Sequence, residues 1–161
     1  MCIRVHPQLA NSYEKYQDEK LRDKVIDASK VDDMYEILAA MDAYITDYSS
    51  AAMDASLTHM PVFIYADDIE QYIKDRGSLL WNLSEDTSKA VSNNKRMTPN
   101  LDLILPFSIA KNNEELEKNI LEFDIDEYLK KMNDYEKGVD LIFDGKASER
   151  VVEKIVNKSR Q

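Results

Sequence analysis

One stretch constrains the fold of this chain more than any other. It is AYITDYSSAAMD, residues 43–54, in which an apolar segment leads through a hydroxyl-rich turn into an alanine-rich segment. This order predicts a buried strand, a turn, and a helix with serine at its N-cap. The amides at a helix N-terminus and the helix dipole favour an anion, so the stretch predicts a site for a phosphorylated ligand. The alternative is that the serine only caps the helix.

Strand and helix patterns alternate on both sides of this stretch. Apolar runs predict strands at residues 3–6, 24–27, 43–46, 62–65 and 107–110. Helical spacing and capping residues predict a helix capped by Asp32, one at 50–59, one capped by Asp67 or Asp68 and ended by Gly77, and others at 113–123, 126–137 and 148–158. The alternation predicts an α/β fold with a parallel sheet and crossover helices.

The composition argues against several functional classes. Acidic residues outnumber basic ones by 31 to 21, and the net charge of −10 disfavours nucleic acid and anionic membrane surfaces as partners. The three glycines allow neither a GxGxxG motif nor a Walker-type loop. Cys2 is the single cysteine, so no internal disulfide is expected. We also expect no transmembrane segment, signal peptide, metal site or cofactor.

The length and the pattern of the chain predict its domain organisation. A chain of 161 residues is expected to form one domain. It starts inside a predicted strand without a preceding cap, so we expect it to be the C-terminal portion of a longer protein. Residues 84–105 are largely polar and lose periodicity, which predicts a long loop or insertion.

Polar residues that follow the predicted strands form the candidate site, because ligands of open α/β sheets bind outside the carboxyl ends of the strands. His6 follows the first strand, and Thr46, Ser49 and Ser50 follow the central one. Asp54 lies four residues after Ser50 on the same helical face, within reach of the ribose of a nucleotide whose phosphates lie at the serines. The alternatives are a structural histidine before a proline and a solvated acid.

Other residues have a structural interpretation. Gly77 after Arg76 is expected to cap a helix C-terminus, and the run at 144–150 to form a turn into the last helix. That helix has an apolar face, formed by Val151, Val152, Ile155 and Val156. His59 is expected at the surface. The aromatic residues expected in the core or at its rim are Trp81, Tyr35, Tyr44 and Tyr48.

These motifs, in this order, resemble the C-terminal half of the CDP-glycerol glycerophosphotransferases, which include teichoic acid primases and polymerases. The resemblance covers nearly the whole chain. The motifs that carry it are His6-Pro7, DMYEIL at 33–38, ITDYSS at 45–50, PVFIY at 61–65, Tyr72 with Asp75-Arg76-Gly77, Pro106-Phe107, and DGKASERVV at 144–152. It implies a Rossmann-like parallel sheet with helices on both faces, one half of a glycosyltransferase-B-type fold, in which residues 1–161 bind a CDP-alditol.

The resemblance also implies a reaction. The family moves an alditol phosphate from CDP-glycerol or CDP-ribitol to a hydroxyl of a lipid-linked teichoic-acid-like or capsular polymer and releases CMP. His6 falls at the family's His-Pro position, which implies a catalytic contact with the donor diphosphate. Ser49 and Ser50, with Thr46 nearby, match the diphosphate-binding turn, whereas the ribose role of Asp54 rests on spacing alone.

The expected partners and location follow from the same resemblance. The acceptor site and the general base are expected in an N-terminal domain outside this chain, so the chain alone is expected to be inactive. The full enzyme is expected in the bacterial cytoplasm, peripheral on the inner face of the membrane.

Two departures from the family pattern concern donor selectivity. Many relatives pass from Arg-Gly to Pro-Phe or Pro-Gly through a short acidic aromatic stretch, whereas this chain inserts most of residues 84–105 there, and Asn82 stands where an aspartate is common. Two alternatives stay open: the donor-binding half of a nucleotide-sugar glycosyltransferase, and an inactive binding module.

Overall fold

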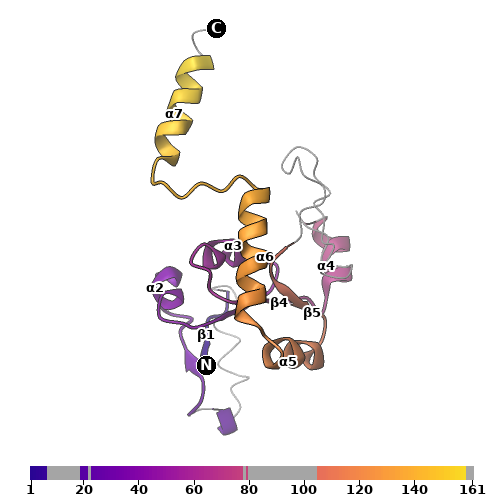
Figure 1. Ribbon diagram of the computed structural model, residues 1–161. Helices are drawn as coiled ribbons and strands as arrows, with labels where there is room; N and C mark the ends of the chain where they lie inside the picture. Colours follow the sequence, from indigo (N-terminus) through magenta and orange to yellow (C-terminus); the bar gives the residue numbers. More distant parts are fainter. Residues whose placement is uncertain (7–18, 22, 78, 80–104, 159–161) are drawn as a thin grey trace. The chain divides into compact units, whose positions relative to one another are not determined.

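The computed structural model describes residues 1–6, 19–21, 23–77, 79 and 105–158. These residues belong to two compact units, Met1–Tyr44 and Ile45–Gln161. Strands alternate with helices along the chain (Figure 1), which confirms the predicted α/β class. The expected insertion at 84–105 lies outside the described residues except for Leu105, which is buried. Trp81 and Asn82 also lie outside them.

The first unit contains a short parallel pair of strands. β1 (Cys2–Ile3) pairs with β2 (Ile26–Asp27), and the 3-10 helix η2 (Glu19–Leu21) precedes β2. Both strands are shorter than predicted, so His6 lies three residues beyond β1. The ladder stops early because the amide of Val5 donates to the hydroxyl of Ser29 at 3.2 Å instead of to a backbone carbonyl.

The helix of the first unit begins one residue later than predicted. α2 (Met34–Leu38) is capped by Asp33, whose Oδ1 accepts from the amide of Tyr35 at 2.8 Å. Asp32 was the predicted cap, and the two carboxylates are chemically equivalent for this purpose. The backbone decides between them, because Asp33 has the extended conformation of an N-cap residue.

The second unit is built on a three-stranded sheet in the spatial order β3 (Tyr44–Thr46), β4 (Val62–Tyr65), β5 (Ser108–Ala110). Strand β4 is central and runs parallel to β5, with Ile64 opposite Ile109. The described strands therefore form two sheets rather than the single parallel sheet predicted.

Helices connect the strands of this sheet and follow it. α3 (Ala51–Ser56) joins β3 to β4, and α4 (Ile69–Arg76) follows β4. α3 ends three residues before the predicted end, because the chain turns through His59, which has a φ of 58°. Gly77 caps α4 as predicted, with a φ of 89° that favours glycine.

The core of the second unit lies where α5 (Asn113–Leu121) and α6 (Ile125–Gly138) meet the sheet. β4 contributes Val62, Phe63 and Ile64, all buried, and α6 contributes Met132, which is 1% exposed. The ring of Phe123, between the two helices, meets Phe63 edge-on with centroids 5.4 Å apart. The apolar run predicted as a strand at 62–65 is therefore a buried core strand.

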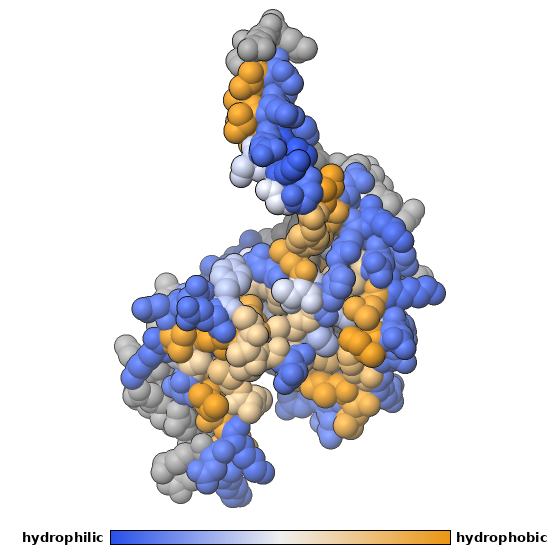
Figure 2. Space-filling model, turned by 60° about the vertical axis from the view of Figure 1, so that its left-hand side comes forward, coloured by the Kyte–Doolittle hydropathy of each residue, from blue (hydrophilic) through white to orange (hydrophobic). Residues whose placement is uncertain are grey.

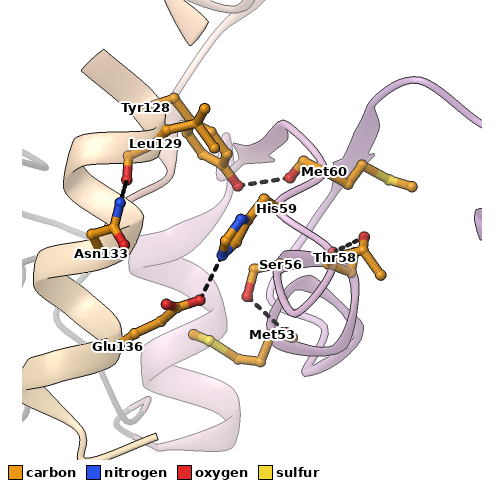
Figure 3. A network of polar contacts seen from close by, with 10 residues as sticks. Met53, Ser56, Thr58, His59, Met60, Tyr128, Leu129, Asn133 and Glu136 are labelled. Atoms are coloured by element: carbon orange, nitrogen blue, oxygen red, sulfur yellow. Dashed lines mark hydrogen bonds and ion pairs between the residues drawn. The ribbon is translucent and has the colours of Figure 1, made fainter. Parts of the chain in front are cut away.

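Two polar contacts join α6 to the turn between α3 and β4 (Figure 3). The hydroxyl of Tyr128 donates to the carbonyl of Met60 at 2.7 Å. His59 Nε2 lies 2.8 Å from Glu136 Oε1, and the His59 side chain is exposed, as predicted. Polar contacts with the turn after α3, as well as packing in the core, therefore fix the position of α6.

The last helix, α7 (Ala147–Lys158), forms as predicted but buries none of its side chains in the part of the chain that the structure describes. Val151, Val152 and Ile155 are each more than half exposed, and Figure 2 shows apolar side chains along one side of this helix. The predicted turn before it is confirmed: Asp144 accepts from the amide of Lys146 at 2.9 Å and from Arg150 Nη1 at 2.7 Å. None of the described helices is long and apolar enough to cross a membrane.

Candidate functional site

The turn at 47–50, between β3 and α3, carries the two serines singled out from the sequence. Its hydrogen bonds are local: the amide of Ser49 donates to Asp47 Oδ1 at 3.1 Å, and the amide of Ala51 donates to Ser49 Oγ at 3.3 Å. The amide of Ala52 then donates to the carbonyl of Ser49 at 3.2 Å. The amide of Ser49 and the first two amides of α3 therefore have acceptors within this segment.

This pattern corrects the expectation that α3 opens on bare amides. Ser50 occupies the N-cap position, but its backbone is already helical and its hydroxyl makes no capping bond. Ser49 does the capping instead.

The turn offers a ligand the hydroxyl groups of its two serines. Ser49 and Ser50 are both exposed. A serine hydroxyl that accepts one hydrogen bond still has its own proton to donate, so each side chain can donate to a phosphate oxygen. Asp47 is exposed beside them, and its negative charge means that an anion at this turn needs a cation from another segment.

Tyr48 links the 47–50 turn to α4. Its hydroxyl donates to Asp68 Oδ1, and its ring packs against the ring of Tyr72 with centroids 4.4 Å apart. Desolvation by burial, reinforced by the hydrogen bond with Asp68, raises the pKa of the Tyr48 phenol. Tyr48 was expected in the core or at its rim, and the sequence reasoning missed its polar partner. The sequence alone carried no signal for this partner, because the link depends on β3 and β4 being neighbours in the sheet.

A cavity of about 300 Å³ lies at the carboxyl ends of β4 and β5. Its lining residues include the acidic Asp67, Asp68 and Glu70 and the basic Lys74 and Lys111. Asp67 and Asp68 were considered only as helix caps, and Asp68, at the N-cap position of α4, makes no side-chain capping bond. Both the cavity and the 47–50 turn follow the carboxyl ends of strands, where ligands bind in sheets of this kind.

The structure places four of the five predicted site residues in one unit. Thr46 ends β3 half-buried, Ser49 and Ser50 lie in the turn, and Asp54 lies exposed on α3. His6 is exposed in the other unit, Met1–Tyr44. The binding roles of all five stay predictions. In the described part of the chain no group of three or more His, Cys, Asp or Glu side chains could hold a metal ion.

Residues 1–157 match the family described as CDP-Glycerol:Poly(glycerophosphate) glycerophosphotransferase. The chain belongs to this family. The match covers all the motifs on which the resemblance rested, from His6-Pro7 to DGKASERVV at 144–152. No solved structure matches the chain.

Teichoic acid primases and a teichoic acid polymerase are similar to this chain over about half of its length. The teichoic acid ribitol-phosphate primase of Bacillus spizizenii is 32% identical over 76 residues, which are 47% of this chain and 18% of that protein. The teichoic acid poly(glycerol phosphate) polymerase of Staphylococcus epidermidis is 31% identical over 86 residues, 53% of this chain and 12% of that protein. The teichoic acid glycerol-phosphate primase of Bacillus subtilis is 30% identical over 78 residues, 48% of this chain and 19% of that protein. The matched stretch thus spans less than a fifth of each relative.

Proposed function

We propose that this chain is the donor-binding domain of a CDP-glycerol or CDP-ribitol glycerophosphotransferase and forms the C-terminal half of a glycosyltransferase-B-type enzyme. The observation that carries the proposal is the family match over residues 1–157, nearly the whole chain. The hydroxyl-bearing turn after β3 supports it, because this turn lies where sheets of this class bind nucleotides.

In the proposed reaction, a hydroxyl oxygen of the acceptor attacks the phosphorus that bears the alditol. The bond from that phosphorus to the oxygen bridging it to CMP breaks, CMP leaves with the bond's electron pair, and the hydroxyl proton passes to a general base outside this chain. The acceptor is the end of a lipid-linked teichoic-acid-like or capsular polymer. The enzyme would therefore work on the cytoplasmic face of the membrane, where an acceptor domain completes the site.

Each predicted residue has a role in this proposal. The hydroxyls of Ser49 and Ser50, with Thr46 nearby, donate to the diphosphate, and Asp54 accepts from the ribose hydroxyls. His6 donates to the phosphate oxygens that gain charge as CMP leaves. A donor aimed at developing charge acts on the rate more than on ground-state binding. In the full enzyme, His6→Ala should then lower the transfer rate on the order of 10²- to 10³-fold and weaken donor binding much less.

Calorimetry on the 161-residue chain tests the donor-binding role. CDP and CDP-glycerol should bind more tightly than UDP or GDP, and the chain alone should transfer nothing. Ser50→Ala should weaken CDP binding by about tenfold, because a hydrogen bond to a charged phosphate is lost. Thr58→Ala is the matched control. The Thr58 hydroxyl lies beyond the C-terminal end of α3, where it donates to the carbonyl of Ala55, and Thr58 is not part of the 47–50 turn.

The outcomes separate the alternatives. A preference for UDP or GDP would indicate a nucleotide-sugar glycosyltransferase. Cytidine-selective binding together with an inactive full enzyme would indicate a binding module. If CDP does not bind at all, the donor-binding role is wrong.

A further inference from the structure

We propose that Tyr48 is a positioning residue of the donor site. Its hydroxyl and its ring hold the 47–50 turn against α4, so that the hydroxyls of Ser49 and Ser50 are in place before the donor binds. The proposal rests on the donor-binding function proposed above and adds a residue that itself makes no contact with the donor.

The geometry supports this role because the two contacts of Tyr48 reach a distant segment. Asp68, which accepts from the Tyr48 hydroxyl, lies 20 residues further along the chain. Tyr72, in the first turn of α4, packs against the Tyr48 ring. Among the hydrogen bonds described for residues 47–50, the one to Asp68 is the one that leaves the turn and α3. The others shape the turn without attaching it to another element.

The neighbouring contacts would hold the turn less firmly. α3 has only six residues. Its buried side chains are those of Ala51, Ala52, Ala55 and Ser56, which are small and bury little apolar area each, and Met53 Sδ accepts from the Tyr135 hydroxyl at 3.4 Å. A tyrosine ring in contact with another ring adds a larger and directional contact. The ring and hydroxyl of Tyr48 therefore add a restraint that links the turn directly to α4 and the residue before it.

The side chain of Asp68 can accept the hydrogen bond from Tyr48 because it does not cap α4. Although it stands at the N-cap position of α4, its side chain accepts no capping hydrogen bond from the helix. It also lines the cavity at the carboxyl ends of β4 and β5. Replacing Asp68 therefore tests the link to Tyr48 without removing a helix cap.

The first measurement is amide hydrogen exchange in the 161-residue chain without ligand. In Tyr48→Phe, which keeps the ring and removes the hydrogen bond, amides at 47–53 should exchange about tenfold faster than in the wild type. Tyr65→Phe is the matched control, because it removes a similar hydrogen bond, 3.0 Å from the Tyr65 hydroxyl to Asn113 Oδ1, at the end of the next strand. It should leave exchange at 47–53 unchanged.

The second measurement is rescue by a conservative variant, read as CDP affinity. Asp68→Ala removes the acceptor and should weaken CDP binding about fivefold, as should Tyr48→Phe, whereas Asp68→Asn keeps a carbonyl oxygen and should bind like the wild type. The double variant Tyr48→Phe/Asp68→Ala should be no weaker than either single one, because both remove the same interaction.

The two measurements separate failure of this inference from failure of the proposed function. Unchanged exchange at 47–53 in Tyr48→Phe overturns the positioning role, as does a CDP affinity equal to that of Tyr65→Phe. A wild-type chain that does not bind CDP overturns the donor-binding function, and with it the donor role of Tyr48, even where the exchange result shows that Tyr48 holds the turn.

Discussion

α6 and α7 are both amphipathic helices, and the same helical spacing predicted each of them. α6 buries Tyr128, Met132 and Tyr135, whereas α7 buries no side chain among the described residues. The comparison shows what helical spacing can and cannot establish. It predicts that a helix forms and which side is apolar, but not whether a partner covers that side.

The partner of α6 is fixed by contacts from several elements. Aromatic rings from β4 and from the segment before the helix pack beside it, and Tyr128 and Glu136 make polar contacts with the turn after α3. The polar contacts of α7 include those with its own preceding turn, where Asp144 pairs with Arg150. Substitutions on the two helices should therefore have very different effects.

The largest difference is expected between Met132→Ala and Val151→Ala. Met132 is 1% exposed, so its truncation should lower the free energy of unfolding by about 2 to 5 kcal/mol. Val151 is 57% exposed, so its truncation should change the free energy by less than about 0.5 kcal/mol. Urea denaturation followed by circular dichroism measures both.

Val151→Ala also controls for helix propensity, since alanine favours a helix more than valine does. A loss of more than about 2 kcal/mol in Val151→Ala would mean that the apolar face of α7 is covered in the folded chain, and the comparison would fail.

The hydroxyl of Tyr128 should give the next largest effect, and one that depends on pH. Burial raises the pKa of Tyr128 to about 12, so the folded state keeps its proton above about pH 10, where the unfolded chain loses it. This contribution is complete below the unfolded pKa and is lost as pH rises toward the folded pKa. Tyr128→Phe should cost about 1 to 2 kcal/mol at neutral pH through the lost bond to Met60.

The pH profile distinguishes this account from a general effect of alkali. Denaturation of both proteins between about pH 9 and pH 11 should show the wild type losing stability more steeply than Tyr128→Phe, because the variant lacks the raised pKa of the Tyr128 phenol and keeps all the other tyrosines. Parallel profiles would show that the Tyr128 phenol titrates alike in the folded and unfolded chains.

Most elements of the fold were predictable from the sequence, because local patterns determine them. The strand at 62–65 and the Gly77 cap were predicted at the right residues, and α5, α6 and α7 within a few residues. The strands of the first unit were too long in the prediction. A hydrogen bond from the Val5 amide to the Ser29 side chain ends that ladder, and no local pattern encodes a contact between residues 24 positions apart.

The candidate site was predictable in location but not in detail. ITDYSS indicated a turn after a strand, and the turn is there. Which serine caps α3 was not predictable, since Ser49 and Ser50 have the same side chain and only the backbone conformation of Ser50 excludes it. The link from Tyr48 to Asp68 depends on strand order, which becomes apparent only once β3 and β4 lie side by side.

The smallest effect is expected at His59, whose side chain contacts α6 through Glu136. The φ of His59 is 58°, a conformation that costs a residue with a Cβ about 1 kcal/mol and costs glycine almost nothing. His59→Ala and His59→Gly both lose the exposed pair with Glu136, which is worth less than about 1 kcal/mol, but only glycine relieves the backbone. His59→Gly should therefore be the more stable of the two by about 0.5 to 1 kcal/mol in urea denaturation.

Thr58 provides the control, because its φ is not positive. At this position the glycine variant should be less stable than the alanine variant. If both positions rank alanine above glycine, then the turn after α3 does not hold His59 in the left-handed region, and its contact with α6 does not depend on that backbone conformation.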